Sequence, residues 1–272
     1  MSARVSIGIA AAAGADLAAR LAPQIEAAGF HALWVNDTPG SDALEVLAAA
    51  ARASERLVLA TGVLPVDRRE PAQILERVAQ LDLPADRLVL GIGSGAGAVG
   101  ALARVRDAAA ALREGSRARV VVGALGPRMR RLGATASDGL LLSWLTPEAA
   151  REQAAEAHGL ASDAHVALYV RTAVEDAAIP RLEAETARYA GFPAYAANLE
   201  RLGIDAGATV LRPDAVADGL AAYRPHVDEV VLRAIVAEES PAAYERLGGG
   251  GGAPPPPSHP APRRPPGRPA GP

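Results

Sequence analysis

The strongest constraint on the fold of this chain is a regular alternation of strand-like and helix-like segments with short connections. Most strand-like segments are continuous apolar runs, the pattern of parallel strands that are covered on both faces. Helical patterns, with apolar residues recurring every three or four positions, follow these strands. The predicted strands are eight segments, at residues 4–10, 32–35, 56–64, 87–93, 120–122, 139–143, 165–170 and 229–236. The order predicts an α/β protein with a parallel sheet.

Length favours a closed sheet over an open one. The chain has 272 residues, and a (β/α)8 barrel of about 250 residues is ordinarily a single domain. An open doubly wound sheet shows the same alternation, but eight units before the composition changes favour a TIM barrel over residues 1–247. From residue 248 the chain continues with five glycines and then proline-rich sequence. Such a composition buries no core, so residues 248–272 are expected to form a disordered tail.

Composition excludes several classes of function. The net charge is −3 and the arginines are interspersed with acidic residues, so no nucleic-acid partner is expected. No apolar run approaches the roughly 20 residues that span a bilayer, and the N-terminus lacks a signal-peptide core, so a cytoplasmic protein is expected. The chain has no cysteine and no lysine, which excludes thiolate nucleophiles and Schiff-base lysines. Its five histidines lack ligand spacing, so no metal site is expected.

The most specific candidate site lies in residues 120–132. Three valines predict a short buried strand, Gly123 and Gly126 bracket a tight turn, and Pro127 suits the first position of a helix. A helix start offers unpaired N–H groups and partial positive charge to a phosphate. The predicted phosphate contacts are the turn residues Gly123, Ala124, Leu125 and Gly126, three of them small, and a nearby cation, Arg128. The alternative is a strand-to-helix turn that needs glycine only for its geometry.

Chemistry in such a barrel lies at the carboxyl ends of the strands. These ends are rich in Gly, Ser and Thr, and the residues considered there as ligand contacts are Gly62, Val63, Ser94, Gly95, Trp144 and Arg171. Asp37 is the only ionisable candidate besides the arginines, either as a catalytic group or as a turn residue before Pro39. Trp144 either stacks on a flat ligand or closes the barrel. Arg171 is a second candidate phosphate contact. Together these features favour a large, planar, phosphorylated cofactor.

Five segments, in order, resemble the luciferase-like monooxygenase superfamily. They carry its second to sixth strands, at residues 27–35, 59–65, 87–95, 123–128 and 137–144. The resemblance implies a TIM barrel that uses either reduced FMN, with oxygen and a separate flavin reductase, or a deazaflavin, coenzyme F420, as hydride carrier. It also implies that the turn at 123–126 holds the cofactor phosphate. A non-proline cis peptide bond between Gly62 and Val63, behind the ring system, is implied as well.

The chain departs from the deazaflavin-dependent dehydrogenases of this superfamily at two positions. Those enzymes carry Asp-His after the second strand, whereas this chain has Asp37 followed by Thr38. They also carry a glutamate just after the Gly-(Ser/Thr)-Gly of the fourth strand, where this chain has Ala96. The segment after Ser94 is short, so dehydrogenation of a sugar phosphate is not expected.

Three hypotheses follow from these observations. The first is a flavin- or F420-dependent oxidoreductase or monooxygenase that acts on a small organic molecule, with Asp37 as a polar contact rather than a strong base. The second is a barrel that binds the cofactor without turnover. The third is a phosphosugar isomerase or lyase, for which Asp37 is the only available base. A homodimer is a further option.

Overall fold

The computed structural model describes residues 3–96, 99–238, 240 and 242–244. The predicted tail, residues 248–272, lies outside the described residues. The proposed domain boundary after residue 247 therefore stays a prediction.

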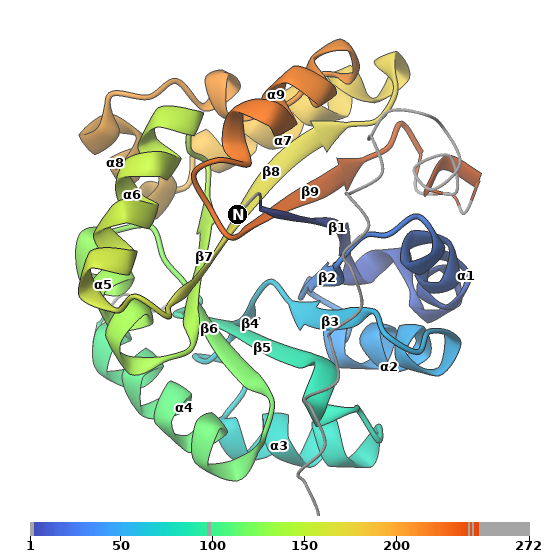
Figure 1. The fold of residues 1–272 in the computed structure, drawn as a ribbon, viewed down its shortest axis with the longest axis vertical. Helices are drawn as coiled ribbons and strands as arrows, with labels where there is room; N and C mark the ends of the chain where they lie inside the picture. The colour runs from blue at the N-terminus through green and yellow to red at the C-terminus, as the bar shows by residue number, and fades with distance from the viewer. Residues whose placement is uncertain (1–2, 97–98, 239, 241, 245–272) are drawn as a thin grey trace, which may run out of the picture.

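The strands close into a barrel, which confirms the predicted fold (Figure 1). Within the described residues the strands are β1 (Arg4–Ala10), β2 (Ala32–Asn36), β3 (Val58–Thr61), β4 (Leu64–Pro65), β5 (Leu88–Gly93), β6 (Arg119–Gly123), β7 (Gly139–Ser143), β8 (His165–Ala173) and β9 (Glu229–Ile235). Their order is β3-β2-β1-β9-β8-β7-β6-β5-β4, and β3 also pairs with β5. Both β3 and β4 run parallel to β5. Together they form one interrupted strand, so the barrel is eight-stranded over the described residues.

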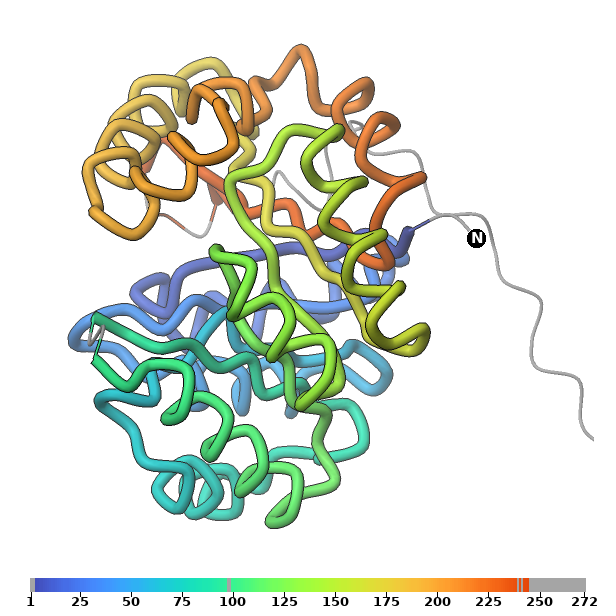
Figure 2. The backbone as a smooth tube through the Cα atoms, turned by 90° about the vertical axis from the view of Figure 1, so that its left-hand side faces the viewer, coloured from blue at the N-terminus to red at the C-terminus, as the bar shows by residue number. Residues whose placement is uncertain are grey.

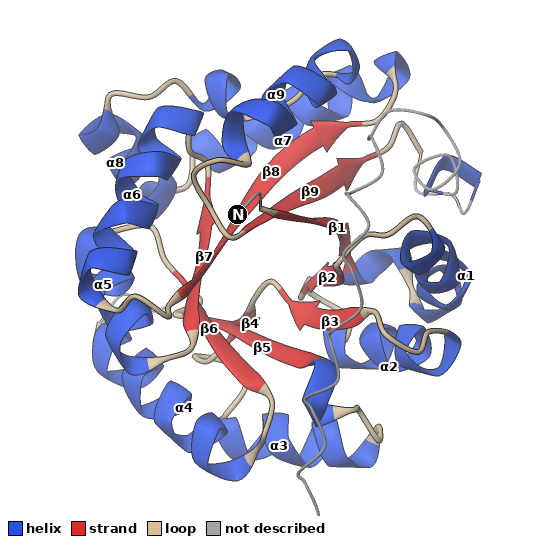
Figure 3. Ribbon diagram, viewed as in Figure 1, coloured by secondary structure: helices blue, strands red, loops and turns tan. Residues whose placement is uncertain are grey.

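The helices form an outer layer around this sheet (Figure 3). In the same residues they are α1 (Ala15–Ala27), α2 (Ala43–Ala53), α3 (Pro71–Gln80), α4 (Ala101–Gly115), α5 (Pro127–Ala136), α6 (Pro147–Leu160), α7 (Ile179–Ala190), α8 (Pro193–Leu202) and α9 (Val216–Tyr223). Two of these helices begin at a side-chain cap. Asp42 accepts a hydrogen bond from the Leu44 N–H, and Thr146 accepts one from the Ala149 N–H. No described helix is both long and apolar enough to cross a membrane.

Two strands differ from the sequence expectation by more than one residue at an end. The third strand, expected to be continuous over 56–64, is interrupted at Gly62 and Val63. The seventh, expected to end at residue 170, continues to Ala173 because β9 pairs with it as far as Ala173 and Ile235. This extension places Arg171 inside the sheet rather than in the loop after it.

Aromatic and aliphatic side chains fill the barrel interior. Tyr169 lies near its centre, 6.1 Å from Trp34 between ring centroids, in an edge-to-face arrangement. A Cβ atom added to Gly8 or to Gly62 would lie 3.0 Å from the Tyr169 side chain, so both glycines leave room for this ring. Figure 2 shows α7 and α8, drawn in yellow and orange, at the end of the barrel opposite the N-terminus.

Candidate active site

Alternation along the strands determines which side chains reach the inside of the barrel at its carboxyl end. The interior cluster contains Trp34, Val121, Leu141, Tyr169 and Val231. The residues two positions further along the same strands therefore face the same side. They are Asn36, Gly123, Ser143, Arg171 and Arg233. This set is more polar than the layer beneath it, as expected of the functional end of a barrel.

The interruption between β3 and β4 fits closely against the neighbouring strands. The peptide bond between Gly62 and Val63 is cis, as the family resemblance implied. A Cβ atom on Gly93 would lie 2.6 Å from a Val63 methyl group, and one on Gly123 would lie 3.0 Å from the other. Asn36 donates its Nδ2 proton to the Gly62 carbonyl at 2.5 Å, while its Oδ1 is buried without a partner among the described residues. Gly93 and Gly123 therefore make room for Val63.

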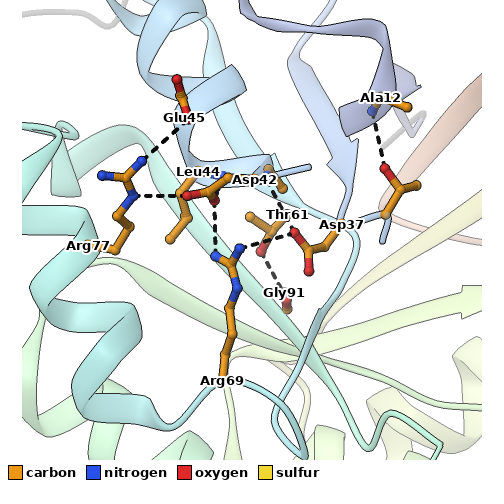
Figure 4. Close-up of polar contacts among 11 residues, drawn as sticks. Ala12, Asp37, Asp42, Leu44, Glu45, Thr61, Arg69, Arg77 and Gly91 are labelled. Atoms are coloured by element: carbon orange, nitrogen blue, oxygen red, sulfur yellow. Dashed lines mark hydrogen bonds and ion pairs between the residues drawn. The ribbon is translucent and has the colours of Figure 1, made fainter. Parts of the chain in front are cut away.

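Asp37 is held by protein groups (Figure 4). Its side chain is 5 % exposed and lies 3.7 Å from the Arg69 guanidinium, and it accepts a 3.3 Å hydrogen bond from the Ala43 N–H. Arg69 also pairs with Asp42 at 3.0 Å, and Asp42 pairs with Arg77 at 2.9 Å. Burial acts to raise the pKa of Asp42, but hydrogen bonds from Arg77 and Arg69 outweigh it and lower that pKa. These contacts match a residue that fixes the start of α2.

The turn after β5 is contacted by an acidic residue from the loop after β4, Asp67, which the sequence analysis did not single out. Gly95 has φ +67°, and a Cβ atom there would lie 1.8 Å from the Asp67 carboxylate. Asp67 accepts a hydrogen bond from the Ala96 N–H at 2.9 Å. The Ser94 hydroxyl lies 3.4 Å from the Gly95 carbonyl. Glycine at position 95 is therefore required both by the backbone conformation and by the approach of Asp67.

In the turn after β6, one backbone N–H group has a hydrogen-bond acceptor and two have none among the described residues. The Ala124 N–H donates to the Leu141 carbonyl at 3.1 Å. The N–H groups of Leu125 and Gly126 have no hydrogen-bond acceptor in the described part of the chain. Gly126 precedes α5 with φ −85° and ψ 159°, and a Cβ atom there would meet nothing within 4 Å. Neither backbone conformation nor crowding requires glycine at 126, so turn geometry alone does not account for it.

Arginines surround this turn. Arg130, which is buried, donates to the Leu125 carbonyl at 3.0 Å and pairs with Glu156 at 2.7 Å. Arg128 is exposed and forms no ion pair with any described residue. Arg201, on α8, reaches the Leu125 carbonyl at 3.4 Å. The sequence analysis missed Arg201 because it lies 76 residues away along the chain.

Trp144 and Arg171 lie together beneath α7. Trp144 is 2 % exposed, and the Arg171 guanidinium carbon is 4.2 Å from its ring centroid and 4.6 Å from that of Tyr189. Arg171 also pairs with Glu185 at 3.3 Å and donates to the Ser143 hydroxyl at 2.5 Å. Trp144 is thus packed inside the protein against Tyr189, and Glu185 neutralises the charge of Arg171.

Two further polar groups at this end were absent from the sequence-based candidates. The Tyr169 hydroxyl is buried without a hydrogen-bond partner in the described residues, and burial raises the pKa of Tyr169. Arg233 is 8 % exposed and donates to the Ala234 carbonyl. The only sequence signal for either residue is the period-two alternation of β8 and β9, which directs both side chains inward.

Comparison with known proteins agrees with this geometry. Residues 1–114 match the family described as luciferase-like monooxygenase. The resemblance found in the second, third and fourth strands is thereby confirmed. No curated protein sequence matches the chain.

Solved structures of luciferase-like enzymes share the fold across nearly the whole chain. The coenzyme F420-dependent tetrahydromethanopterin reductase of Methanopyrus kandleri is 17% identical, with TM-score 0.67 over 90% of this chain and 98% of that one. The oxygenating constituent of 3,6-diketocamphane monooxygenase from Pseudomonas putida, solved with FMN, is 15% identical, with TM-score 0.64 over 89% and 95%. Monooxygenase RslO1 from Streptomyces bottropensis is 19% identical, with TM-score 0.64 over 90% and 98%. At these identities the likeness concerns the fold.

Proposed function

We propose that this luciferase-like barrel is an oxidoreductase that uses FMN or coenzyme F420 on a small organic substrate. The observation that carries the proposal is the turn before α5, where the N–H groups of Leu125 and Gly126 have no acceptor among the described residues. The family match over residues 1–114 and the F420- and FMN-dependent neighbours support a cofactor of this class. No observation favours the alternative of a barrel that binds the cofactor without turnover.

The residues around the turn suit the cofactor phosphate. The two amides lie at the positive end of the α5 dipole, and space is open where a Gly126 side chain would stand. Arg128 and Arg201 add two cations that have no carboxylate partner among the described residues. Arg171 is a weaker candidate than predicted because Glu185 already neutralises it.

The ring system is assigned to the strand ends that the resemblance indicated. Gly62, Val63, Ser94 and Gly95 border the interior at this end, and Val63 presents its side chain to it. When bound, the cofactor supplies hydride transfer or oxygen activation. The chain's own residues orient the ring and exclude water around it. The separate reductase, the homodimer and the cytoplasmic location remain predictions.

The decisive test is a pair of substitutions at Gly126. Gly126→Glu brings bulk and negative charge to the proposed phosphate position and should lower cofactor affinity by at least about 2–3 kcal/mol, the scale of one charge-assisted hydrogen bond. Gly126→Ala is the matched control, because its methyl group meets nothing within 4 Å. It should bind as the wild type does. Titration with FMN and with coenzyme F420, followed by visible absorption, identifies the cofactor. Equal binding by the glutamate variant would place the phosphate elsewhere.

A second variant tests Arg201, which reaches the turn from α8. Arg201→Met removes a cation while leaving the backbone of the turn unchanged. We expect cofactor affinity to fall about tenfold, less than for Gly126→Glu, because one charge-assisted contact is lost without added repulsion. Arg212→Met removes an exposed arginine that pairs with Glu183 at 2.6 Å and makes no hydrogen bond to the turn among the described residues, so it should leave affinity unchanged. Equal binding by Arg201→Met would restrict the site to α5.

A further inference from the structure

Arg233 is a buried cation without a carboxylate partner. It is 8 % exposed, and no carboxylate of the described residues lies within 4 Å of its guanidinium. The one acidic residue of β9 is Glu229, four residues earlier and therefore about 13 Å away along the strand. Among the described residues, the only hydrogen-bond acceptor of Arg233 is the Ala234 carbonyl. A buried guanidinium in this state is costly because its five N–H groups and its charge are poorly satisfied.

The charged groups around Arg233 do not neutralise its positive charge. Arg171 stands beside it on β8, in register with it. Of these two buried guanidinium groups only Arg171 has a carboxylate, Glu185, which also pairs with the exposed Arg188 at 3.9 Å. The two buried guanidinium groups and Glu185 therefore leave a net charge of +1 inside the barrel. Asp37, at the same end of the barrel, is paired with Arg69. This surplus matches a monoanion better than a phosphate dianion.

A neutral hydrogen-bonding group accompanies the cation. Tyr169 occupies the preceding inward position on β8, and its hydroxyl is buried without a partner among the described residues. Gly8 pairs in register with Arg233 on β1, and its missing side chain leaves room for the Tyr169 hydroxyl at 3.0 Å. The Tyr169 hydroxyl and Arg233 thus project into the same part of the barrel interior, from adjacent strands.

We propose that Arg233 and the Tyr169 hydroxyl bind a carboxylate of the substrate at the carboxyl end of the barrel. A carboxylate accepts hydrogen bonds from both groups and neutralises the surplus charge. Its role as part of the substrate rests on the proposed function, whereas the anion site itself does not. The substrate class is therefore a small monocarboxylic acid, oriented by its carboxylate within the site that holds the cofactor.

The test measures binding of monocarboxylates to the purified protein in the absence of cofactor. Acetate, butyrate and benzoate are the probes, with benzamide as a neutral counterpart and inorganic phosphate as a second anion. At least one carboxylate should bind the wild type, and Arg233→Met should weaken that binding tenfold or more. Tyr169→Phe should weaken it several-fold. Arg52→Met, an exposed arginine on α2, should bind as the wild type does.

Stability separates a binding residue from a structural one. Removing an unpaired buried charge should leave the melting temperature of Arg233→Met equal to or above that of the wild type. A lower melting temperature, equal carboxylate binding by Arg233→Met, or binding of phosphate but of no carboxylate would each overturn the proposal. FMN and coenzyme F420 are titrated in parallel. If a carboxylate binds through Arg233 and neither cofactor binds, the proposed function fails and the anion site stands.

Discussion

The two ends of the barrel interior hold ionic groups on the same strand, β9, in very different surroundings. At the amino-terminal end, Glu229 is 2 % exposed and accepts hydrogen bonds from Ser6 at 2.5 Å, Trp34 at 2.6 Å and His165 at 2.8 Å. At the carboxyl end, Arg233 is almost as deeply buried and has only a backbone acceptor. Three side chains of the protein donate hydrogen bonds to Glu229, whereas Arg233 has no carboxylate partner among the described residues and is proposed to bind a ligand.

This contrast shows how one strand can serve stability at one end and binding at the other. A buried charge whose hydrogen bonds are all made locks the surrounding side chains in place. A buried charge without them lowers the stability of the free protein, and a ligand that supplies the missing contacts restores it. The same division is general in TIM barrels, where chemistry lies at the carboxyl ends of the strands.

The largest effect is expected from breaking the compensated end. Glu229→Ala leaves the donors from Ser6, Trp34 and His165 without their acceptor, and should lower the free energy of unfolding by about 3–5 kcal/mol, as for other buried ionic groups that lose a partner. Glu229→Gln is the control, because its amide oxygen still accepts from Ser6 and Trp34, and it should cost much less. Urea unfolding measures both. An alanine variant as stable as the wild type would contradict the contrast between the two ends.

A smaller loss of stability is expected at low pH, where Glu229 at the amino-terminal end of the barrel becomes protonated. Burial acts to raise the pKa of Glu229, but the hydrogen bond and charge of His165 outweigh it and lower that pKa from 4.5 to about 2. Because the folded pKa is depressed, the stabilisation is complete above pH 4.5 and is lost as the pH falls towards 2. The shift corresponds to about 3 kcal/mol.

His31 extends this loss to milder acid. Burial lowers the pKa of His31 from 6.5 to about 4, and the charges of Arg4 and Arg119 act in the same direction against the attraction of Glu229. The unfolded chain therefore takes up a proton below pH 6.5 that the folded protein takes up only near pH 4. The free energy of unfolding should fall as the pH drops from 6.5 to 4, by at most about 3 kcal/mol. Urea unfolding of wild type and His31→Gln at pH 7.5, 5.5 and 4.5 checks this, and identical pH profiles would show that His31 has no part in it.

The sequence predicts the barrel far better than it predicts the site. Apolar runs and caps such as Asp42 and Thr146 are local signals, and the structure follows them closely. Site contacts depend on which strands become neighbours. Glu185 neutralises Arg171 from α7, and Arg201 reaches the turn before α5 from α8. No local pattern contains those pairings.

Arg233 shows a second limit of sequence reasoning. It lies within an apolar segment, 229–236, whose pattern predicts a strand, and the structure has β9 at Glu229–Ile235. The strand assignment classed the segment as core, and a single arginine does not change that assignment. Alternation along the strand directs this arginine inward, but only the register of β9 against β8 and β1 places it beside Arg171 and Gly8. Polar residues within predicted core strands therefore merit the same attention as those in the loops.

The smallest effect is expected from a substitution of Asp37. This residue lies at the carboxyl end of the barrel, but its charge is paired within the protein, as that of Glu229 is. Asp37→Asn keeps an oxygen for the Ala43 N–H and loses only the 3.7 Å ion pair with Arg69, which still has Asp42. The free energy of unfolding should therefore fall by less than about 1 kcal/mol. Once a substrate is known, turnover should fall less than tenfold, because a carboxylate already held by protein groups is poorly placed to accept a substrate proton. Urea unfolding and kcat of the variant are the measurements. A loss of several orders of magnitude in kcat, with stability preserved, would make Asp37 a catalytic base. A charged group that is paired within the protein would then take part in the reaction, which contradicts the contrast drawn from Glu229 and Arg233.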